Sequence, residues 1–140
     1  ALAHFSVMVK RRKIMIELFA IGIGGALGAV SRFLLADSVT GIFGSDFPYG
    51  ILVVNVVGSF FMGVCFELLV ESTLLPAVWR SAIMVGFLGA FTTFSTFSMQ
   101  VVGFLQVGRW VDALGYILGS VCLTVIAVII GIFITRQLTA

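Results

Sequence analysis

Charged side chains are scarce in this sequence, and their scarcity excludes a water-soluble domain. Only eight Lys or Arg and six Asp or Glu occur in 140 residues, of which 61% are hydrophobic, and the mean hydropathy is +1.24. A soluble domain of this length carries many more polar residues to cover its surface. Lipid must therefore surround most of the chain, and the sequence predicts an integral membrane protein of one domain, residues 1–140.

Residues that build disulfide frameworks, metal sites and common active sites are also nearly absent. The two cysteines, Cys65 and Cys122, lie far apart in separate apolar segments, and the sequence has a single histidine. This pattern gives neither a disulfide framework nor a cysteine–histidine metal site, and the motifs of common hydrolases and phosphate-binding enzymes are missing. We therefore expect no enzyme, and a net charge of +2 gives no reason to expect a nucleic-acid partner.

Four apolar segments are long enough to cross a membrane. They cover residues 14–35, 50–70, 78–107 and 110–134. Each is apolar on all sides instead of alternating, which excludes barrel strands and predicts helices. We expect a polar loop from Asp37 to Tyr49, where Pro48 marks a turn, and a short loop from Glu71 to Pro76. The predicted fold is all-α, with four transmembrane helices.

Small residues at helical spacing predict close packing between these helices. The pairs are Gly24 with Gly28, Ser59 with Gly63, and Gly115 with Gly119. Such pairs let helix backbones approach closely inside a membrane. They indicate a tight bundle and no particular function.

Basic residues are unevenly divided between the two sides of the predicted bundle. The termini and the second loop carry six: Lys10, Arg11, Arg12, Lys13, Arg80 and Arg136. The other side carries only Arg32 and Arg109. This excess predicts that both termini face the cytoplasm. The run from Lys10 to Lys13 is typical of a cytoplasmic flank or a contact with lipid headgroups.

Hydroxyl side chains crowd the third segment, where residues 86–98 read GFLGAFTTFSTFS. Five of the last seven carry hydroxyls: Thr92, Thr93, Ser95, Thr96 and Ser98. They can bond back to carbonyls of their own helix, but together with Gly86 and Gly89 they also weaken it. A break at membrane depth is tolerated only where it is buried in protein or lines water. Carbonyls freed there suit a cation such as Na⁺.

Phe94 and Phe97 are spaced i, i+3 and share a face if this stretch is helical. The edge of a phenyl ring carries partial positive charge, so a pair of edges can favour an anion without a fixed charge. Weak sites of this kind are what ion conduction requires. Alternatively, both rings simply face lipid or the protein core.

Further polar residues lie within the second and fourth segments. Asn55 is the one amide of the second segment, suited either to a hydrogen bond between helices or to donation to an anion. Tyr116, Ser120 and Thr124 are spaced i, i+4, i+8, which places three hydroxyls along one helix face. This row could hold helices together or line a pore.

Ionised residues are missing from the middle of every predicted span. Glu17, Glu67 and Arg32 lie near span ends, where long side chains reach the interface. A proton-coupled small multidrug exporter needs a buried carboxylate, so this pattern disfavours one. That exporter and a non-transporting assembly subunit are the two alternatives to a channel.

The third segment closely resembles the signature of the Fluc (CrcB) fluoride channels. The resemblance extends to Gly24-Gly25-Ala-Leu-Gly28 with Arg32-Phe33 in the first segment, to Asn55-Val-Val-Gly58 in the second, and to the hydroxyl row of the fourth. It implies a fluoride-selective channel for passive fluoride efflux in the bacterial inner membrane. It also implies an antiparallel, dual-topology dimer with two pores.

The resemblance implies roles for individual residues. Phe94, Phe97 and Asn55 would contact fluoride, and the polar track would comprise Ser95, Thr96, Tyr116, Ser120 and Thr124. A structural Na⁺ at the dimer centre would be held by backbone carbonyls of Gly89 and Thr92 from both subunits, and Arg32 would be a structural anchor.

Two features depart from the resemblance. Gln100 stands where many such channels have a glutamate, which removes any role that needs a charge there. The basic excess on one side is also larger than expected for a subunit that inserts in both orientations. The chain is therefore either one copy of a homodimer or one half of a pair with a homologous subunit.

Overall fold

The computed structural model describes residues 2–71 and 75–139, and this part of the chain is built of helices joined by turns. Within it, four helical segments are long and apolar enough to cross a membrane: Lys10–Phe43, Tyr49–Glu71, Ala77–Gln106 and Trp110–Thr139. The predicted all-α fold class and the number of spans are thereby confirmed. Residues 72–74, half of the predicted loop from Glu71 to Pro76, lie outside the described residues.

The first helix, α1 (Leu2–Phe43), is much longer than the predicted span 14–35. Its 42 residues extend about 63 Å at 1.5 Å per residue. A loop does precede α2 at residues 44–48, but its predicted start at Asp37 was wrong, because the polar residues there are compatible with a helix. Ser38, for example, donates to the Leu34 carbonyl at 2.7 Å. The helix ends only at Gly44, whose φ of 81° is left-handed and whose N–H donates to the Thr40 carbonyl.

The second and fourth spans pack against each other. They are α2 (Tyr49–Cys65), continued by the wider turns of η1 (Phe66–Glu71), and α6 (Trp110–Thr139). A Cβ on Gly63 would lie 2.2 Å from the Val128 carbonyl oxygen, and one on Gly131 would lie 2.3 Å from that of Phe60. The backbones therefore approach closely at Gly63, as predicted.

The third span is divided into short pieces. They are α3 (Ala77–Arg80), η2 (Ser81–Leu88), α4 (Gly89–Phe91) and α5 (Phe94–Gln106). The first span packs along η2.

Glycines again allow this contact between α1 and η2. A Cβ on Gly24 would lie 2.2 Å from the Ala82 carbonyl oxygen, and one on Gly28 would lie 2.1 Å from that of Phe87. The predicted close packing of this GxxxG pair is confirmed. Within the described chain no atom lies within 4 Å of a Cβ on either member of the pair 115 and 119, so the close contact predicted there is not formed inside this subunit.

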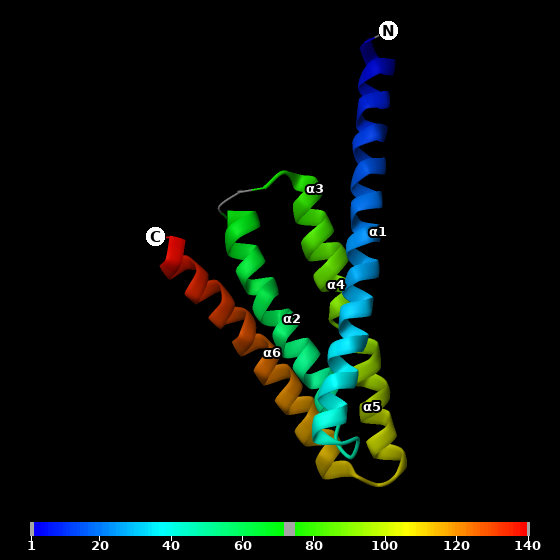
Figure 1. Cartoon of the computed structure of the whole chain (residues 1–140), viewed down its shortest axis with the longest axis vertical. Coiled ribbons are helices and arrows are strands. Elements are labelled where there is room, and N and C mark those ends of the chain that lie inside the picture. The colour runs from blue at the N-terminus through cyan, green and yellow to red at the C-terminus, as the bar shows by residue number, and fades with distance from the viewer. Residues whose placement is uncertain (1, 72–74, 140) are drawn as a thin grey trace.

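The spans are arranged so that both chain termini lie toward one end of the molecule (Figure 1). The turns after α1 and after α5 lie at the opposite end, called the turn end below. The N-terminal part of α1 projects beyond all the other helices.

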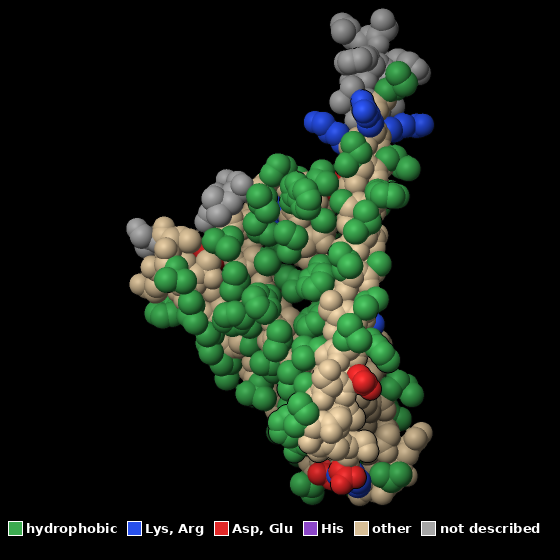
Figure 2. All heavy atoms as spheres, viewed as in Figure 1, with side chains coloured by type: hydrophobic (Ala, Val, Ile, Leu, Met, Phe, Trp, Pro, Cys, Tyr) green, Lys and Arg blue, Asp and Glu red, His purple; other side chains and the backbone are tan. Residues whose placement is uncertain are grey.

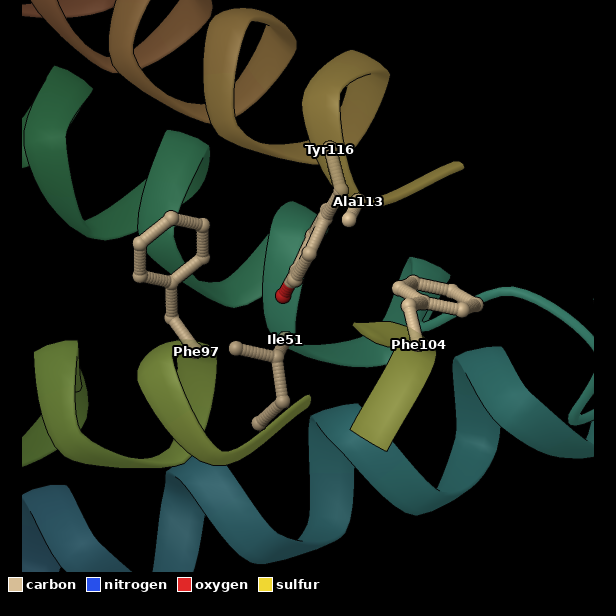
Figure 3. Packing of buried hydrophobic residues seen from close by; sticks show 5 residues of the cluster. All are labelled: Ile51, Phe97, Phe104, Ala113 and Tyr116. Carbon is tan, nitrogen blue, oxygen red and sulfur yellow. The ribbon is translucent and has the colours of Figure 1, made fainter. Parts of the chain in front are cut away.

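A cluster of buried apolar residues lies near the turn end. It contains Ile51, Phe97, Phe104, Ala113 and Tyr116, which come from α2, α5 and α6 (Figure 3). Tyr116 is only 1% exposed. This cluster fixes the second half of the third span against the second and fourth spans.

Apolar side chains also cover much of the outside (Figure 2). Large residues such as Phe19, Phe33 and Phe133 are more than half exposed. In water this surface would be strongly unfavourable, so it faces lipid or a partner subunit.

Candidate functional site

The third span is interrupted between α4 and α5. Thr92 (φ −78°, ψ 158°) and Thr93 (φ −151°, ψ 123°) are extended, and the helix resumes at Phe94. The Thr93 hydroxyl accepts a hydrogen bond from the Thr96 N–H at 3.2 Å, which caps the start of α5. Two extended residues therefore lie inside a membrane-spanning segment, with the second half-helix capped by its own sequence.

Asn55 of α2 binds the extended backbone directly. Its Nδ2 donates to the Thr93 carbonyl at 3.0 Å, and the Thr93 N–H donates to its Oδ1 at 2.8 Å. Both polar groups of a peptide that has left the helical ladder are thereby paired, which hydrocarbon surroundings demand. The predicted hydrogen bond between helices is confirmed, and one N–H of the amide is left for another acceptor.

Two backbone carbonyls lose their usual donors at this break. In a continuous helix the Gly89 carbonyl would accept from Thr93 N–H, and the Thr92 carbonyl would accept from Thr96 N–H. The first of these N–H groups donates instead to Asn55, and the second to the Thr93 hydroxyl. Uncommitted carbonyl oxygens at a broken membrane helix are suitable ligands for Na⁺. The donor chemistry therefore fits the cation that the sequence suggested.

Arg32 of α1 also reaches the break. Its Nη1 lies 3.4 Å from the Thr92 carbonyl oxygen, at the long limit for a hydrogen bond, and the side chain is partly buried. The guanidinium thus links the first span to the third at the point where the third is interrupted.

A cleft of about 270 Å³ opens beside the break. Its lining comes from α2, the break, α5 and α6: Asn55, Gly58, Ser59, Met62, Thr92, Thr93, Phe94, Phe97, Ser120, Val121, Thr124 and Val128. It brings together five of the predicted pathway residues, namely the amide, the two phenyl rings and two hydroxyls. No ionisable side chain is part of this lining.

The two phenylalanines have unequal surroundings. Their ring centroids are 5.4 Å apart, so they share a face as the i, i+3 spacing predicted. Phe97 is 7% exposed and its ring lies 5.0 Å from that of Tyr116, whereas Phe94 is 77% exposed. Phe97 is held by the core, and Phe94 projects from the subunit to where lipid or a partner must cover it.

The hydroxyls of α6 in the cleft also differ. Thr124 donates back to the Ser120 carbonyl at 2.7 Å, so its proton is used within its own helix. Ser120 is 6% exposed, and among the described residues its Oγ has no hydrogen-bond partner. A buried hydroxyl without a partner costs about 1–3 kcal/mol. Ser120 therefore has a proton available for a ligand in the cleft.

Tyr116 does not line this cleft and lies in the buried cluster near the turn end. Its hydroxyl donates to Gln100 Oε1 at 2.7 Å. Gln100 lines two further cavities nearer the turn end, of about 390 and 260 Å³, and Thr96 lines the smaller one. In the described part of the chain, the hydrogen bond from Tyr116 is the one side-chain hydrogen bond of Gln100, so its N–H groups are available to a ligand in these cavities.

Ser95 is a predicted pathway residue that does not line the cleft. It is exposed, lines none of the cavities above, and contacts only the Thr93 hydroxyl at 3.3 Å.

Sequence reasoning did not identify Thr93 and Gln100 as site residues. The spacing of Thr93 three residues before Thr96 is that of an N-cap, and this signal could have located the start of α5. The pairing of Gln100 with Tyr116 joins two spans across a turn, and no local pattern predicts it.

Comparison with known proteins places these observations in a family. The family described as "CrcB-like protein, Camphor Resistance (CrcB)" matches residues 19–132. The chain is 48% identical over 120 residues to a protein of Hahella chejuensis, covering 86% of this chain and 94% of the relative. It is 44% identical over 124 residues to one of Saccharophagus degradans, covering 89% and 92%. It is 41% identical over 124 residues to one of Geobacter sulfurreducens, covering 89% and 100%.

All three relatives carry the name "Fluoride-specific ion channel FluC". The matched region contains the break, the whole lining of the cleft, and the residues of α1 that contact the break. The chain belongs to the CrcB-like family.

Proposed function

We propose that this chain is a subunit of a fluoride-selective channel, through which fluoride leaves a bacterial cell passively and which thereby confers fluoride resistance. The observation that carries this proposal is the uncharged cleft beside Thr92 and Thr93, in which an amide, a free hydroxyl and two phenyl rings converge. The name shared by the relatives supplies the ion. As a multi-pass protein of the bacterial inner membrane, the channel would be driven partly by the inside-negative potential, about 2.3 kcal/mol per charge per 100 mV.

The cleft provides donors that can replace water around a small anion. Fluoride is strongly hydrated, so a pore must offer several donors together. Ser120 has an unused hydroxyl proton, Asn55 has one unused N–H, and the edges of Phe94 and Phe97 carry partial positive charge. Because no Lys or Arg lines the cleft, the anion is held weakly enough to leave again.

The route toward the turn end passes the cavities around Gln100. We assign Thr96 and Tyr116 to this part of the pathway, the first as a lining residue and the second through its hydrogen bond to Gln100. A neutral amide is better suited here than a carboxylate, because its N–H groups donate to an anion without repelling it. We also assign Thr124, which lines the cleft, and Ser95, whose hydroxyl lies 3.3 Å from that of Thr93, to the polar track.

The functional unit would be an antiparallel dimer with two pores, built from two copies or from a pair with a homologous subunit. Three features support a covering partner: Phe94 is 77% exposed, Gly89 is exposed, and the Gly115–Gly119 face meets no atom of this subunit within the described residues. A structural Na⁺ would lie at the dimer centre, held by the Gly89 and Thr92 carbonyls of both subunits. Arg32 would anchor α1 to that centre.

Growth in fluoride tests the proposed function. A bacterial strain without its own fluoride exporters should regain growth in fluoride-containing medium when it expresses this chain, alone or with a homologous subunit. No gain in resistance, with the protein confirmed in the membrane, would contradict the proposal.

The two alternatives predict different results. A proton-coupled multidrug exporter would release protons when it binds a drug, but no carboxylate lines the cleft and Glu67 is paired with Arg136 at 2.9 Å. An assembly subunit would transport nothing in any partner combination.

A further inference from the structure

Four consecutive cations encircle α1 where it projects beyond the bundle. They are Lys10, Arg11, Arg12 and Lys13, called the basic collar below, and all four are exposed. Successive residues of an α-helix are about 100° apart, so four of them cover about 300° of the circumference. Figure 2 shows Lys and Arg side chains projecting to both sides of α1 near its N-terminal end. The collar presents positive charge in nearly every direction around the helix.

Among the described residues, no ion pair involves a collar residue. In the described residues, the ion pairs join Arg109 to Asp112 and Arg136 to Glu67, both away from it. The nearest carboxylate along the helix, Glu17, accepts a hydrogen bond from the Ser81 hydroxyl of η2. Four like charges within about one turn repel one another. Anions from outside the protein would relieve this repulsion.

The position of the collar along α1 indicates where those anions lie. An exposed apolar belt begins directly after it, with Ile14, Met15, Ile16 and Phe19 on different sides of the helix. This belt belongs in hydrocarbon. From Lys13 to Asp37 the helix rises about 36 Å, against a hydrocarbon core of about 30 Å. The collar is therefore held at the level of the lipid phosphates on one side of the membrane.

Basic and acidic residues are unequally divided between the two ends of the subunit, and the basic excess lies at the end that carries the collar. The end that carries the termini has six basic residues against three acidic ones: Glu17, Glu67 and Glu71. The half toward the turns has two basic residues against three acidic ones: Asp37, Asp46 and Asp112. In Figure 2 the red side chains gather at the turn end, opposite the blue ones around α1. Only one end of the molecule is complementary to a negatively charged membrane surface.

We propose that the basic collar is a binding surface for anionic phospholipids, whose headgroup phosphates contact Lys10, Arg11, Arg12 and Lys13 around the helix. Guanidinium groups bind phosphate oxygens in a bidentate manner, and the long lysine stems let the ammonium groups reach the same plane. The bound headgroups fix the depth of α1 at whichever membrane surface its N-terminal end reaches. This inference depends only on the membrane location of the chain, so it stands or falls separately from fluoride conduction.

Lipid retention by the purified full-length chain tests the proposal. The chain is incubated in neutral detergent with equal amounts of phosphatidylglycerol and phosphatidylcholine, and bound lipids are counted by native mass spectrometry. The wild type should retain phosphatidylglycerol at least fivefold over phosphatidylcholine. The variant K10Q/R11Q/R12Q/K13Q should lose this preference, and the charge-keeping variant K10R/R11K/R12K/K13R should retain it. Equal retention of both lipids by the wild type, or an unchanged preference in the glutamine variant, would overturn the proposal.

Two further arms use the wild type alone, so the conclusion does not depend on how a variant folds. Raising the salt concentration to about 1 M should abolish the preference, because charges more than about 3 Å apart are then largely screened from one another. Inorganic phosphate in tenfold excess should leave the lipid bound. Displacement by inorganic phosphate, or tighter binding of a short RNA than of phosphatidylglycerol vesicles, would show that the collar is no lipid site.

Discussion

The Asn55 side chain stabilises the interrupted backbone whether or not an ion is bound. Its amide pairs with both backbone groups of Thr93, which hydrocarbon would otherwise leave without partners. Substitution Asn55→Leu should therefore cost about 2–6 kcal/mol of stability, because each orphaned buried group costs about 1–3 kcal/mol. Reversible unfolding in mixed micelles measures this change.

A matched control for this substitution is Ser59→Ala, one turn further along α2. Ser59 lines the same cleft, and its hydroxyl makes no hydrogen bond to any residue that the structure describes. Its replacement should change stability by less than about 0.5 kcal/mol. If the two variants were equally stable, the two hydrogen bonds between Asn55 and Thr93 would contribute nothing to the free energy of unfolding.

Ser120 and Thr124 allow a hydroxyl without a described partner to be compared with one that is already hydrogen-bonded. Ser120→Ala should reduce fluoride efflux about tenfold or more, because its proton is the one that no described group of the protein uses. Thr124→Val should have a much smaller effect, because the threonine proton already binds the Ser120 carbonyl. Initial rates of efflux from vesicles, at matched protein content, compare the two. Equal effects would contradict the assignment of Ser120 as a donor.

The contact between α1 and η2 depends on glycine at close range. Gly28→Ala would place a methyl group 2.1 Å from the Phe87 carbonyl oxygen, which is backbone and cannot rotate away. The two elements must separate, at a cost of about 1–3 kcal/mol. Gly22→Ala on the same helix is the control, because a Cβ there meets nothing within 4 Å. Thermal unfolding in detergent should show a lower midpoint for the first variant only.

The spans themselves were predictable, because long apolar segments carry their own signal. The end of α1 was not, because the helix tolerates Asp37 and Ser38 on its surface and stops only where Gly44 turns left-handed. The cluster of hydroxyls and glycines in the third span marked the stretch that holds the extended Thr92 and Thr93. What no local pattern could supply was the partner of each polar group. Asn55 with Thr93, and Tyr116 with Gln100, meet only when different spans pack together.

The subunit as a whole is open on the side of the cleft. Phe94 projects from it, and the Gly89 and Thr92 carbonyls lose their helical N–H donors at the break, where Arg32 approaches the Thr92 oxygen at 3.4 Å. These features support the proposed second subunit, and a cation between the two subunits would stabilise the proposed pair. They could not be derived from sequence pattern without the resemblance, because the sequence of one chain does not indicate which lipid-facing side is covered.

Removal of sodium tests this arrangement in the whole assembly. Exchange of Na⁺ for a large organic cation should lower the midpoint of thermal unfolding of the purified assembly, since carbonyl oxygens gathered without a cation repel one another. Restoring Na⁺ should reverse the change, whereas the same ionic strength of choline should not. An unfolding midpoint independent of Na⁺ would argue against a structural cation at Gly89 and Thr92.

Fluoride efflux from sealed vesicles is the most direct test of the central claim, that uncharged donors in the cleft replace the hydration shell of fluoride. The purified chain, alone or with a homologous subunit, is reconstituted, and a fluoride electrode records release down a gradient. Fluoride should leave rapidly, while chloride under the same gradient should leave no faster than from lipid alone. Vesicles that retained fluoride as well as protein-free lipid, in every subunit combination, would contradict the account.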